Sequence, residues 1–553
     1  MNQGTVADVL IIGSGAGGGP LACTLAEEGF RIVVLEKGPR HSPRDDYVHD
    51  ELAVALRGFF VPSVEEEPHI LVRPEDPQPR PTNLGWIATC LGGGTVHMGG
   101  FLYRFHPDDF RMRSRFGAHE ALCDWPYTYA ELEPYYSRAE WAVGVSGDAE
   151  RNPFAGPRSR PYPMPPLSSH PVTDLLDQAC TRRGLHPFPT PRAVNSRPFG
   201  GRPACSYCQW CAGYGCPTDA RGSTQVTLLR QAEATGRCEI RSRAMVRKIT
   251  VDSRGRATGC LYLDEQGREH RVAARVVCVC CSAIESARLL LLSASPQFPD
   301  GLANGNGLVG RYLQFHAASS GHAHFRKELH RDKPLADRHP TLERSLMDYY
   351  FLPDGVSAIA KGGLIRFGLP QLTPVLTALG LAAEGTRILW GSELKHRLRD
   401  LYRENRTLGF EVFHDFLPDD RTRMELDPEV RDRWGLPVAR IHLDPSGHHK
   451  TAGRWLVDRG LEVLDDLGAD RLERRLEGDI ASFLVQGTCR AGRDPRTSVL
   501  NSYCQTHEVP NLWVVDGSFM PTSGGAAPTL TILANAFRTA DHIAERARRG
   551  EIP

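Results

Sequence analysis

Residues 13–19 read Gly-Ser-Gly-Ala-Gly-Gly-Gly and directly follow a short apolar run at residues 9–12. Short β-branched runs of this kind are typical of buried strands, and the residues after the glycines keep an apolar face at helical spacing. Residues 31–36 are a second apolar run, which ends at the carboxylate of Glu36. The sequence therefore predicts a strand–helix–strand unit, which restricts the start of the chain to α/β folds with a parallel sheet.

Three of these glycines, Gly13, Gly15 and Gly18, have the spacing G-x-G-x-x-G between the strand and the helix. The missing side chains let the backbone approach a pyrophosphate at the N-terminus of the helix. Glu36 closes the second strand, where its carboxylate can accept hydrogen bonds from a ribose hydroxyl and repel a 2′-phosphate. We infer a site for an adenine dinucleotide, either FAD or NAD.

The charge balance and the cysteine content restrict the partners and the compartment. Lys plus Arg and Asp plus Glu number 66 each among 553 residues, so we expect no nucleic-acid partner. The sequence starts without a basic segment and a long apolar run, and no apolar stretch approaches the roughly 20 residues of a membrane span. With 15 cysteines and no export signal, we expect mostly free thiols in a cytoplasmic protein.

Two later segments repeat the strand-to-helix pattern. Residues 275–281 form an apolar strand candidate that leads into a predicted helix at 283–292. Residues 511–517 form another strand candidate that ends at a carboxylate, and a predicted helix covers 529–545. We therefore expect a nucleotide-binding domain that is discontinuous in sequence.

The segments between these elements are less regular. Residues 61–83 are rich in Pro, Glu and Arg, and we expect an exposed loop or linker there. Residues 124–138 favour a short helix. The segment 394–406 is charged throughout, which predicts a solvated helix face, with a surface for a partner as the alternative.

Several motifs along the chain, in the same order, resemble those of the glucose-methanol-choline (GMC) oxidoreductase family, whose cofactor is FAD. They are the N-terminal unit, Leu91-Gly92-Gly93-Gly94-Thr95-Val96-His97 with Arg104, residues 205–223, residues 283–288, Gly487-Thr488-Cys489-Arg490 and residues 511–531. The resemblance implies an α/β fold with a discontinuous Rossmann-like FAD-binding domain at 1–110, 200–310 and 480–553. A mixed α/β substrate-binding domain is then expected at 111–199 and 311–479.

The resemblance also implies roles for single residues around FAD. Gly93, Gly94 and Thr95 are expected to line the flavin and pyrophosphate, and Val246 is expected to face the adenine. The residues expected to close over the flavin are Asp516, Gly517, Pro528 and Thr529. His97 falls where some relatives tether FAD covalently through histidine. The alternative, which we favour, is a histidine packed beside a noncovalent flavin.

The sequence departs from the family at the usual catalytic positions. Alcohol-oxidising members carry a histidine three residues before the glycine of the G-T-C-R motif and a histidine or asparagine before the late Pro-Thr. Here these positions are Leu484 and Ala527, and neither side chain can accept a hydroxyl proton. Three explanations stay open: a base elsewhere in the sequence, a substrate that needs no base, or a changed reaction. His448 and His449 are weak candidates for such a base, as are His442 and His507.

Four cysteines lie close together in the sequence, at Cys205, Cys208, Cys211 and Cys216. Four thiolates within twelve residues can converge on one metal centre, and the loop resembles the iron–sulfur loop of bacterial FAD sugar dehydrogenases, with one interval different. An iron–sulfur cluster is therefore a candidate cofactor. A thiol-rich or disulfide-closed turn is the alternative.

We expect an FAD-dependent oxidoreductase that oxidises a hydroxyl of a sugar, polyol, glycoside or aminocyclitol by hydride transfer to flavin N5. The electron acceptor is not specified by the sequence. The alternative is a flavin-dependent lyase, isomerase or decarboxylase-like enzyme, or a non-redox homologue, because Leu484 and Ala527 replace the usual catalytic side chains.

Overall fold

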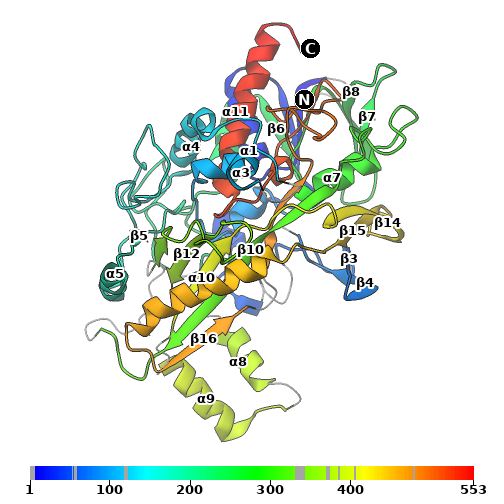
Figure 1. The fold of residues 1–553 in the computed structure, drawn as a ribbon. Coiled ribbons are helices and arrows are strands. Elements are labelled where there is room, and N and C mark those ends of the chain that lie inside the picture. The colour runs from blue at the N-terminus through cyan, green and yellow to red at the C-terminus, as the bar shows by residue number, and fades with distance from the viewer. Residues whose placement is uncertain are drawn as a thin grey trace.

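The protein is an α/β molecule built on three sheets, as the computed structural model in Figure 1 shows. The structure describes residues 6–52, 54, 59–86, 88–117, 122–208, 210–330, 343–368, 374–383, 387–403, 407–476 and 480–552. The predicted fold class is confirmed.

The first sheet is the nucleotide-binding sheet, with the order β6-β2-β1-β9-β8-β7 and β18 paired with β9. Its strands are β1 (Ala7–Ile12), β2 (Ile32–Leu35), β6 (Cys238–Arg241), β7 (Met245–Val251), β8 (Ala257–Leu263), β9 (Glu269–Val279) and β18 (Leu512–Val514). β1 pairs in parallel with both β2 and β9, and β18 also runs parallel to β9. The predicted strand–helix–strand unit is confirmed, because helix α1 (Gly18–Glu27) links β1 to β2.

Helices from distant parts of the sequence pack on this unit. α11 (Thr529–Arg548) contacts both α1 and α4 (Tyr129–Val143), α6 (Leu228–Ala234) contacts α1, and α7 (Ala283–Leu292) follows β9. The sequence placed α7 at the bounds that the structure has, and α11 extends three residues beyond its prediction.

The second sheet is largely antiparallel and has the order β16-β10-β13-β12-β11-β5, with β17 paired with β10. Its strands are β5 (Phe188–Pro189), β10 (Arg311–His324), β11 (Glu343–Leu346), β12 (Gly363–Gly368), β13 (Thr407–His414), β16 (Arg471–Arg475) and β17 (Ile480–Thr488). α10 (His448–Asp465) packs against β10 and β13. β17 lies inside the segment expected for the FAD domain and yet belongs to this sheet, and the domain boundaries stay a prediction.

The third sheet has the order β14-β15-β3-β4, from β3 (His69–Arg73), β4 (Asp76–Thr82), β14 (Arg423–Arg431) and β15 (Pro437–His442). The expectation of a loop at 61–83 is therefore wrong, because most of this segment forms a two-stranded hairpin. β4 contains prolines at 77, 79 and 81, and it lies at the edge of the sheet, where a missing N–H is tolerated.

Five further helices complete the described chain: α2 (Pro43–Asp46), α3 (Met112–Phe116), α5 (Val172–Arg182), α8 (Pro374–Ala382) and α9 (Gly391–Arg403). α9 covers most of the charged segment at 394–406, of which 404–406 lie outside the described residues. Among the residues that the structure describes, no helix has the length and apolar character needed to cross a membrane.

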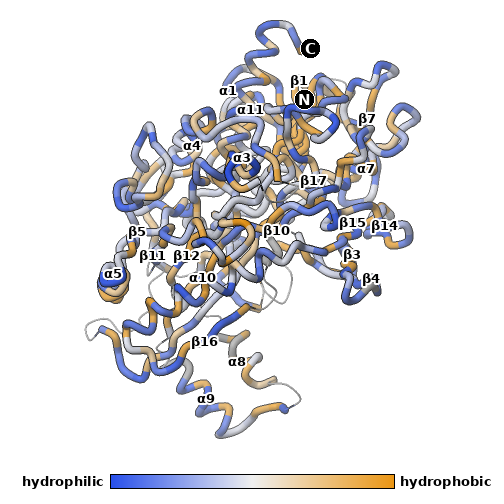
Figure 2. Tube along the Cα trace, viewed as in Figure 1, coloured by the Kyte–Doolittle hydropathy of each residue, from blue (hydrophilic) through white to orange (hydrophobic). Residues whose placement is uncertain are grey.

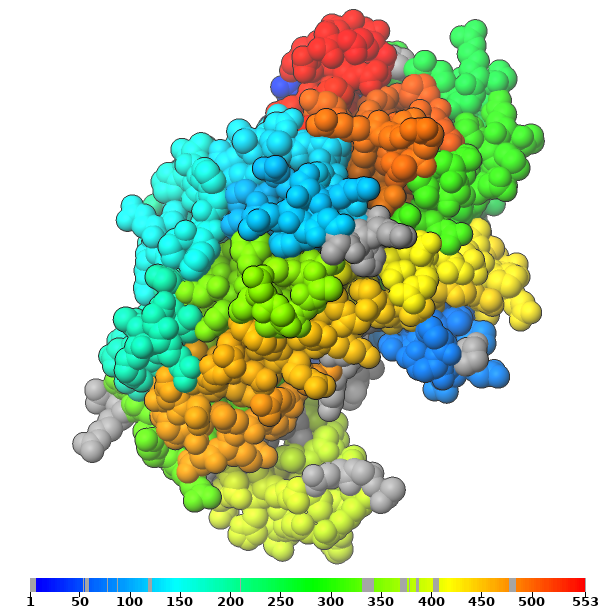
Figure 3. Space-filling model, in the orientation of Figure 1, coloured from blue at the N-terminus to red at the C-terminus, as the bar shows by residue number. Residues whose placement is uncertain are grey.

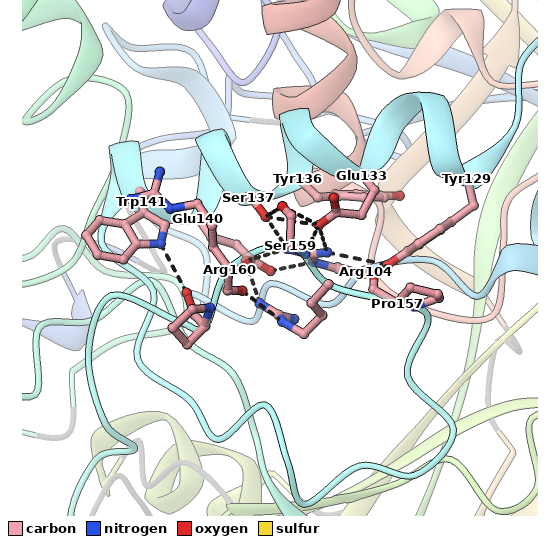
Figure 4. A network of polar contacts seen from close by, with 12 residues as sticks. Arg104, Tyr129, Glu133, Tyr136, Ser137, Glu140, Trp141, Pro157, Ser159 and Arg160 are labelled. Atoms are coloured by element: carbon pink, nitrogen blue, oxygen red, sulfur yellow. Dashed lines mark hydrogen bonds and ion pairs between the residues drawn. The ribbon is translucent and has the colours of Figure 1, made fainter.

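A buried polar network fixes the segment after the second glycine cluster against α4 (Figure 4). The Arg104 guanidinium donates to both carboxylate oxygens of Glu140, at 2.9 and 2.8 Å, and to Glu133 at 2.9 Å. Arg158 donates to the same Glu140 carboxylate. Hydrogen bonds and ion pairs to Glu140 outweigh burial and raise the pKa of Arg104, so the guanidinium stays charged in the core.

Candidate functional site

One cavity of about 790 Å³ is lined by residues of both large sheets. The predicted cofactor positions that line it are Gly13, Gly15, Glu36, Gly93, Gly94, Thr95, His97, Val246, Asp516, Gly517, Pro528 and Thr529. Gly18 does not line the cavity. A Cβ on Gly18 would lie 2.0 Å from the carbonyl oxygen of Gly13, so this glycine allows the helix to pack closely on the turn.

The glycine turn leaves room for a pyrophosphate. Gly13 has φ = 100°, a left-handed conformation that favours glycine, and a Cβ there would lie 2.2 Å from the carbonyl oxygen of Cys280. Gly15 and Gly93 face each other: a Cβ on Gly93 would lie 3.1 Å from the Gly15 Cα. The two backbones therefore form a cradle without side chains at the start of α1, where a phosphate group fits.

Glu36 lies at the end of β2 and lines the same cavity. Its carboxylate accepts hydrogen bonds from the Ser14 hydroxyl at 2.6 Å and from the Gly38 N–H at 2.9 Å. Burial raises the pKa of this carboxyl group, and these hydrogen bonds oppose the shift. They also fix the carboxylate, and a ribose hydroxyl can donate to it.

Asp516 anchors the turn that closes the other side of the cavity. Its carboxylate accepts from the backbone N–H of Ser282 at 3.2 Å and of Ser518 at 2.8 Å, and from the Ser286 hydroxyl. Ser282 has a φ of 84° and a ψ of 162°, which fall in a region that is almost restricted to glycine. The backbone is thus strained at the edge of the cofactor site.

His97 lines the cavity and stacks on Phe60, with 5.2 Å between the ring centroids. Burial, with a smaller contribution from the Arg221 guanidinium, lowers the pKa of His97 to about 4. The imidazole is therefore neutral at pH 7. A neutral imidazole suits either packing beside a flavin or attachment to it.

The sequence did not identify the charged end of the cavity. Arg366 donates to Glu343 at 3.1 Å and also pairs with Glu411. The second oxygen of Glu343 lies 3.4 Å from Arg192. Phe101 lies under both guanidinium groups, at 5.1 Å from Arg192 and 4.1 Å from Arg366.

These charges form a row across neighbouring strands. Arg366 on β12 is directly opposite Glu411 on β13, and Glu343 belongs to β11, the strand on the other side of β12. Two guanidinium groups and two carboxylates balance in charge and offer both donors and acceptors to a ligand. No local motif marks these residues, because the register of the sheet brings them together.

Leu484 and Ala527 both line the cavity, together with the predicted cofactor positions. His448 and His449 do not line it. The two nitrogens of His448 contact Ser357 and the Lys361 carbonyl, and His449 packs on Phe416. Neither His442 nor His507 lines the cavity either. The described side chains that line the cavity and can accept a proton include His97, Glu343 and Glu411.

The four clustered cysteines do not form a metal site in the structure. Cys208 and Cys211 line the cavity, and Cys205 and Cys216 do not. No three His, Cys, Asp or Glu side chains in the described part of the chain are placed to hold a metal ion. The iron–sulfur candidate at these cysteines is therefore not supported, and the structure has all four as free thiols.

Comparisons with known proteins agree with this geometry. Two family models described as "GMC oxidoreductase" match residues 85–318 and 418–536, and one described as "FAD binding domain" matches residues 8–43. The 2-methyl-1,2-propanediol dehydrogenase of Mycolicibacterium austroafricanum is 32% identical over 98% of this chain and 95% of its own length. The chain belongs to the GMC oxidoreductase family.

Two further similarities extend this result. The 6'''-hydroxyparomomycin C oxidase of Streptomyces lividus is 33% identical over 97% of this chain and 91% of that protein. The structure of formate oxidase from Aspergillus oryzae RIB40 covers all of both chains with a TM-score of 0.68 at 14% identity, which shows a shared fold. The GMC protein described here is an FAD-dependent oxidoreductase.

The residues present fit FAD. The cradle between Gly15 and Gly93 suits the pyrophosphate, Glu36 suits a ribose, and the buried turn at Asp516 closes the opposite wall. Val246, Leu289 and Leu292 add apolar side chains to the lining of the cavity. When bound, FAD supplies a two-electron acceptor for a hydride.

Proposed function

We propose that this GMC oxidoreductase oxidises a hydroxyl group of a neutral sugar, polyol or glycoside. The observation that carries the proposal is the row formed by Glu343, Arg366 and Glu411 in the same cavity as the FAD fingerprint. Alternating donors and acceptors match the hydroxyl groups of a polyhydroxylated ligand. The named relatives act on diols and on aminoglycosides, according to their names.

The charge balance of this row favours a neutral substrate over an aminocyclitol. Glu343 is held by two guanidinium groups, and Glu411 by one. An ammonium group of an aminocyclitol has to compete with these guanidinium groups for the carboxylates, whereas a hydroxyl can donate to a carboxylate oxygen without displacing them. Glu411 is half exposed, so it is the carboxylate of this row that is best placed to meet a ligand.

The proton of the hydroxyl group has to go to a base other than residues 484 and 527. His97, Glu343 and Glu411 line the cavity, and we propose that the base is one of these three side chains. Glu411 is the first to test, because Glu343 is fixed by two arginines and His97 packs on Phe60.

The experiment is anaerobic mixing of the holoprotein with separate panels of neutral sugars, polyols and diols and of aminoglycosides, followed by flavin absorbance. The expected result is bleaching of the flavin by at least one neutral compound. Glu411→Gln should then lower kcat about a hundredfold or more if Glu411 is the base, and should raise KM about tenfold if Glu411 only binds the ligand through a charge-assisted hydrogen bond. Glu425→Gln is the matched control, since Glu425 is equally exposed outside the cavity. Bleaching by aminoglycosides alone contradicts the neutral-substrate proposal.

A second candidate function is a non-redox or lyase-type reaction, which Leu484 and Ala527 favour because the usual proton acceptors are missing. The same experiment separates the two functions. A compound that is converted to product while the flavin stays oxidised supports the second function, and bleaching supports the first.

We further propose a cytoplasmic location and a noncovalent FAD. All 15 cysteines are free thiols in the structure, which supports a reducing compartment.

Acid precipitation tests the FAD attachment: a noncovalent flavin appears in the supernatant, whereas a flavin that stays with the precipitate and is released in His97→Ala shows a bond to His97. The electron acceptor is tested by re-oxidation of the bleached enzyme with oxygen or with a quinone.

A further inference from the structure

A buried ion cluster lies behind the segment that leads to Ala527 in the wall of the cavity. The Lys361 ammonium is 3.0 Å from a carboxylate oxygen of Asp109 and 2.9 Å from one of Asp415, and all three side chains are fully buried. The Tyr350 hydroxyl donates to the second oxygen of Asp109 at 2.6 Å, and Lys361 Nζ lies 3.9 Å from the centre of the Tyr350 ring. These four residues, here called the Lys361 cluster, do not line the cavity.

The members of the Lys361 cluster come from distant parts of the chain. Asp109 lies just before α3, Asp415 directly follows β13, and Lys361 lies just before β12. Hydrophilic stretches of the chain reach the middle of the molecule beside β10 (Figure 2). Residues 351–360 lead from Tyr350 to Lys361 over the surface, where Figure 3 shows them in light green between α3 and α10. Folding thus brings one cation and two carboxylates together in the core.

The segment in front of the cluster, residues 522–526, has the sequence Thr-Ser-Gly-Gly-Ala. None of these side chains is larger than threonine, so the segment has no large apolar side chain to anchor it in the core. Its backbone has to be fixed by hydrogen bonds and by close contacts. The next three residues, Ala527, Pro528 and Thr529, all line the cavity. A shift of the segment therefore moves the wall of the FAD cavity.

The Lys361 cluster makes direct contacts to this segment. The Ser523 hydroxyl donates to the Asp415 carboxylate at 2.9 Å. The Gly525 N–H donates to the Tyr350 hydroxyl at 3.1 Å. The Gly525 backbone also lies against the ammonium, because a Cβ at this position would be 2.6 Å from Lys361 Nζ. The cluster therefore sets the place of two residues that come shortly before the cavity wall.

The cluster keeps its charges and its hydrogen-bond donors in the core. Burial lowers the pKa of Lys361, but the carboxylates of Asp109 and Asp415 raise this pKa more, so the ammonium stays charged. Burial and the neighbouring Asp109 carboxylate raise the pKa of Tyr350 well above its ordinary value, so the hydroxyl keeps the proton that it donates. Replacing buried ions by apolar side chains of similar volume is often neutral or stabilising, so stability alone does not account for the cluster.

We propose that the Lys361 cluster is a positioning group for the reaction: it fixes residues 522–526 and thereby the place of Ala527 and Pro528 in the wall of the FAD cavity. The cluster acts through the backbone of this segment and touches neither substrate nor cofactor. The effect on the rate can be large, because a misplacement of about 1 Å at a reacting centre can cost about a hundredfold in rate.

The experiment compares the holoproteins of the parent, Tyr350→Phe and Lys361→Met. The first measurement is kcat and KM for a neutral compound that bleaches the flavin of the parent, and it rests on the proposed function. Tyr350→Phe should lower kcat about tenfold and Lys361→Met about a hundredfold, with KM within about threefold of the parent. The second measurement is the visible circular dichroism of the bound flavin, which needs no substrate and should change in both variants.

Tyr129→Phe is the matched control. The Tyr129 hydroxyl also belongs to a buried ion network, because it contacts Arg104 at 3.4 Å and donates to the Pro157 carbonyl at 2.8 Å, but Tyr129 does not line the cavity. This variant should keep the kcat and the circular dichroism of the parent. The FAD content and the unfolding temperature show whether each variant is loaded and folded, and Tyr350→Phe decides if Lys361→Met does not fold.

A kcat and a circular dichroism spectrum of Tyr350→Phe that equal those of the parent overturn the proposal. So does an equal fall of kcat in Tyr350→Phe and Tyr129→Phe, because any buried network then has the same effect. If no neutral compound bleaches the parent, the proposed function fails, and the circular dichroism of Tyr350→Phe against Tyr129→Phe still decides on the Lys361 cluster.

Discussion

The backbone N–H of Ser282 donates to the carboxylate of Asp516 at 3.2 Å, and the same residue holds a φ of 84° and a ψ of 162°. The hydrogen bond links the turn before α7 to the turn that closes the flavin side of the cavity. The hydrogen bond to Asp516 therefore helps to hold Ser282 in its strained backbone conformation, next to the cofactor site.

Ser282→Gly is expected to stabilise the protein by about 1 kcal/mol, since the relieved strain exceeds the entropy that glycine adds to the unfolded chain. The measurement is urea unfolding of the holoprotein, with a higher midpoint and an unchanged m-value. Ser282→Ala is the control, because it removes the hydroxyl and keeps the strained Cβ. A midpoint for the glycine variant at or below that of the alanine variant contradicts the argument.

The parts of the fold that could be predicted are those with a clear pattern in a short stretch of sequence. β1 and β2 are short apolar runs, the glycine turn separates β1 from α1, and all of these lie within about 30 residues, which is the size of one βαβ unit. The helix α7 directly follows another apolar run. Gly13, Gly15 and Glu36 could be assigned because the motif fixes their positions relative to a strand and a helix.

The charged end of the cavity could not be predicted in this way. Glu343, Arg366 and Glu411 lie on three different strands with no motif that links them, and the antiparallel register of the sheet brings them together. β4 was missed for another reason: its prolines read as a loop, and its edge position, which tolerates them, is a property of the whole sheet. The strain at Ser282 could not be predicted either, because it is seen only in the backbone angles.

The low pKa of His97, about 4, makes folding stability depend on pH. The folded state disfavours the charged imidazole, whereas the unfolded chain protonates near the ordinary value of 6.5. The contribution of His97 to the free energy of unfolding is therefore fully present above pH 6.5. It is lost as the pH falls toward 4, by up to about 3 kcal/mol.

The measurement for His97 is the free energy of unfolding across this pH range for the parent and for His97→Gln. The variant should show a smaller slope, because one of the histidines that titrate differently in the two states is gone. His396→Gln, which removes an exposed histidine of α9, should keep the slope of the parent. Equal slopes for the parent and His97→Gln would falsify the assignment.

Installing the usual family side chains tests where the base lies. If the base is elsewhere in the cavity, Leu484→His/Ala527→Asn should change kcat by less than about tenfold and leave the acid limb of the pH–rate profile in place. General-base catalysis contributes about 10²–10⁴-fold, so a gain of that size in the double variant means that the parent has no working base. Leu484→Asn/Ala527→Asn is the control for polarity without a base.

Breaking the buried Arg104–Glu140 pair should cost more free energy of unfolding than breaking the exposed Arg496–Asp494 pair. Both side chains are buried, and the guanidinium donates to both oxygens of Glu140 and to Glu133 (Figure 4). Arg104→Leu leaves two buried carboxylates short of a partner, and we expect a loss of about 3–5 kcal/mol in the free energy of unfolding.

Arg496→Leu is the matched control, because Arg496 pairs with Asp494 on the surface and exposed pairs contribute about 1 kcal/mol or less. The double variant Arg104→Leu/Glu140→Leu should recover part of the loss, since it removes one stranded carboxylate together with the arginine. Chemical denaturation of the four proteins measures these differences. A loss in Arg104→Leu as small as that in Arg496→Leu means that water or Arg158, which also contacts Glu140, compensates the two carboxylates.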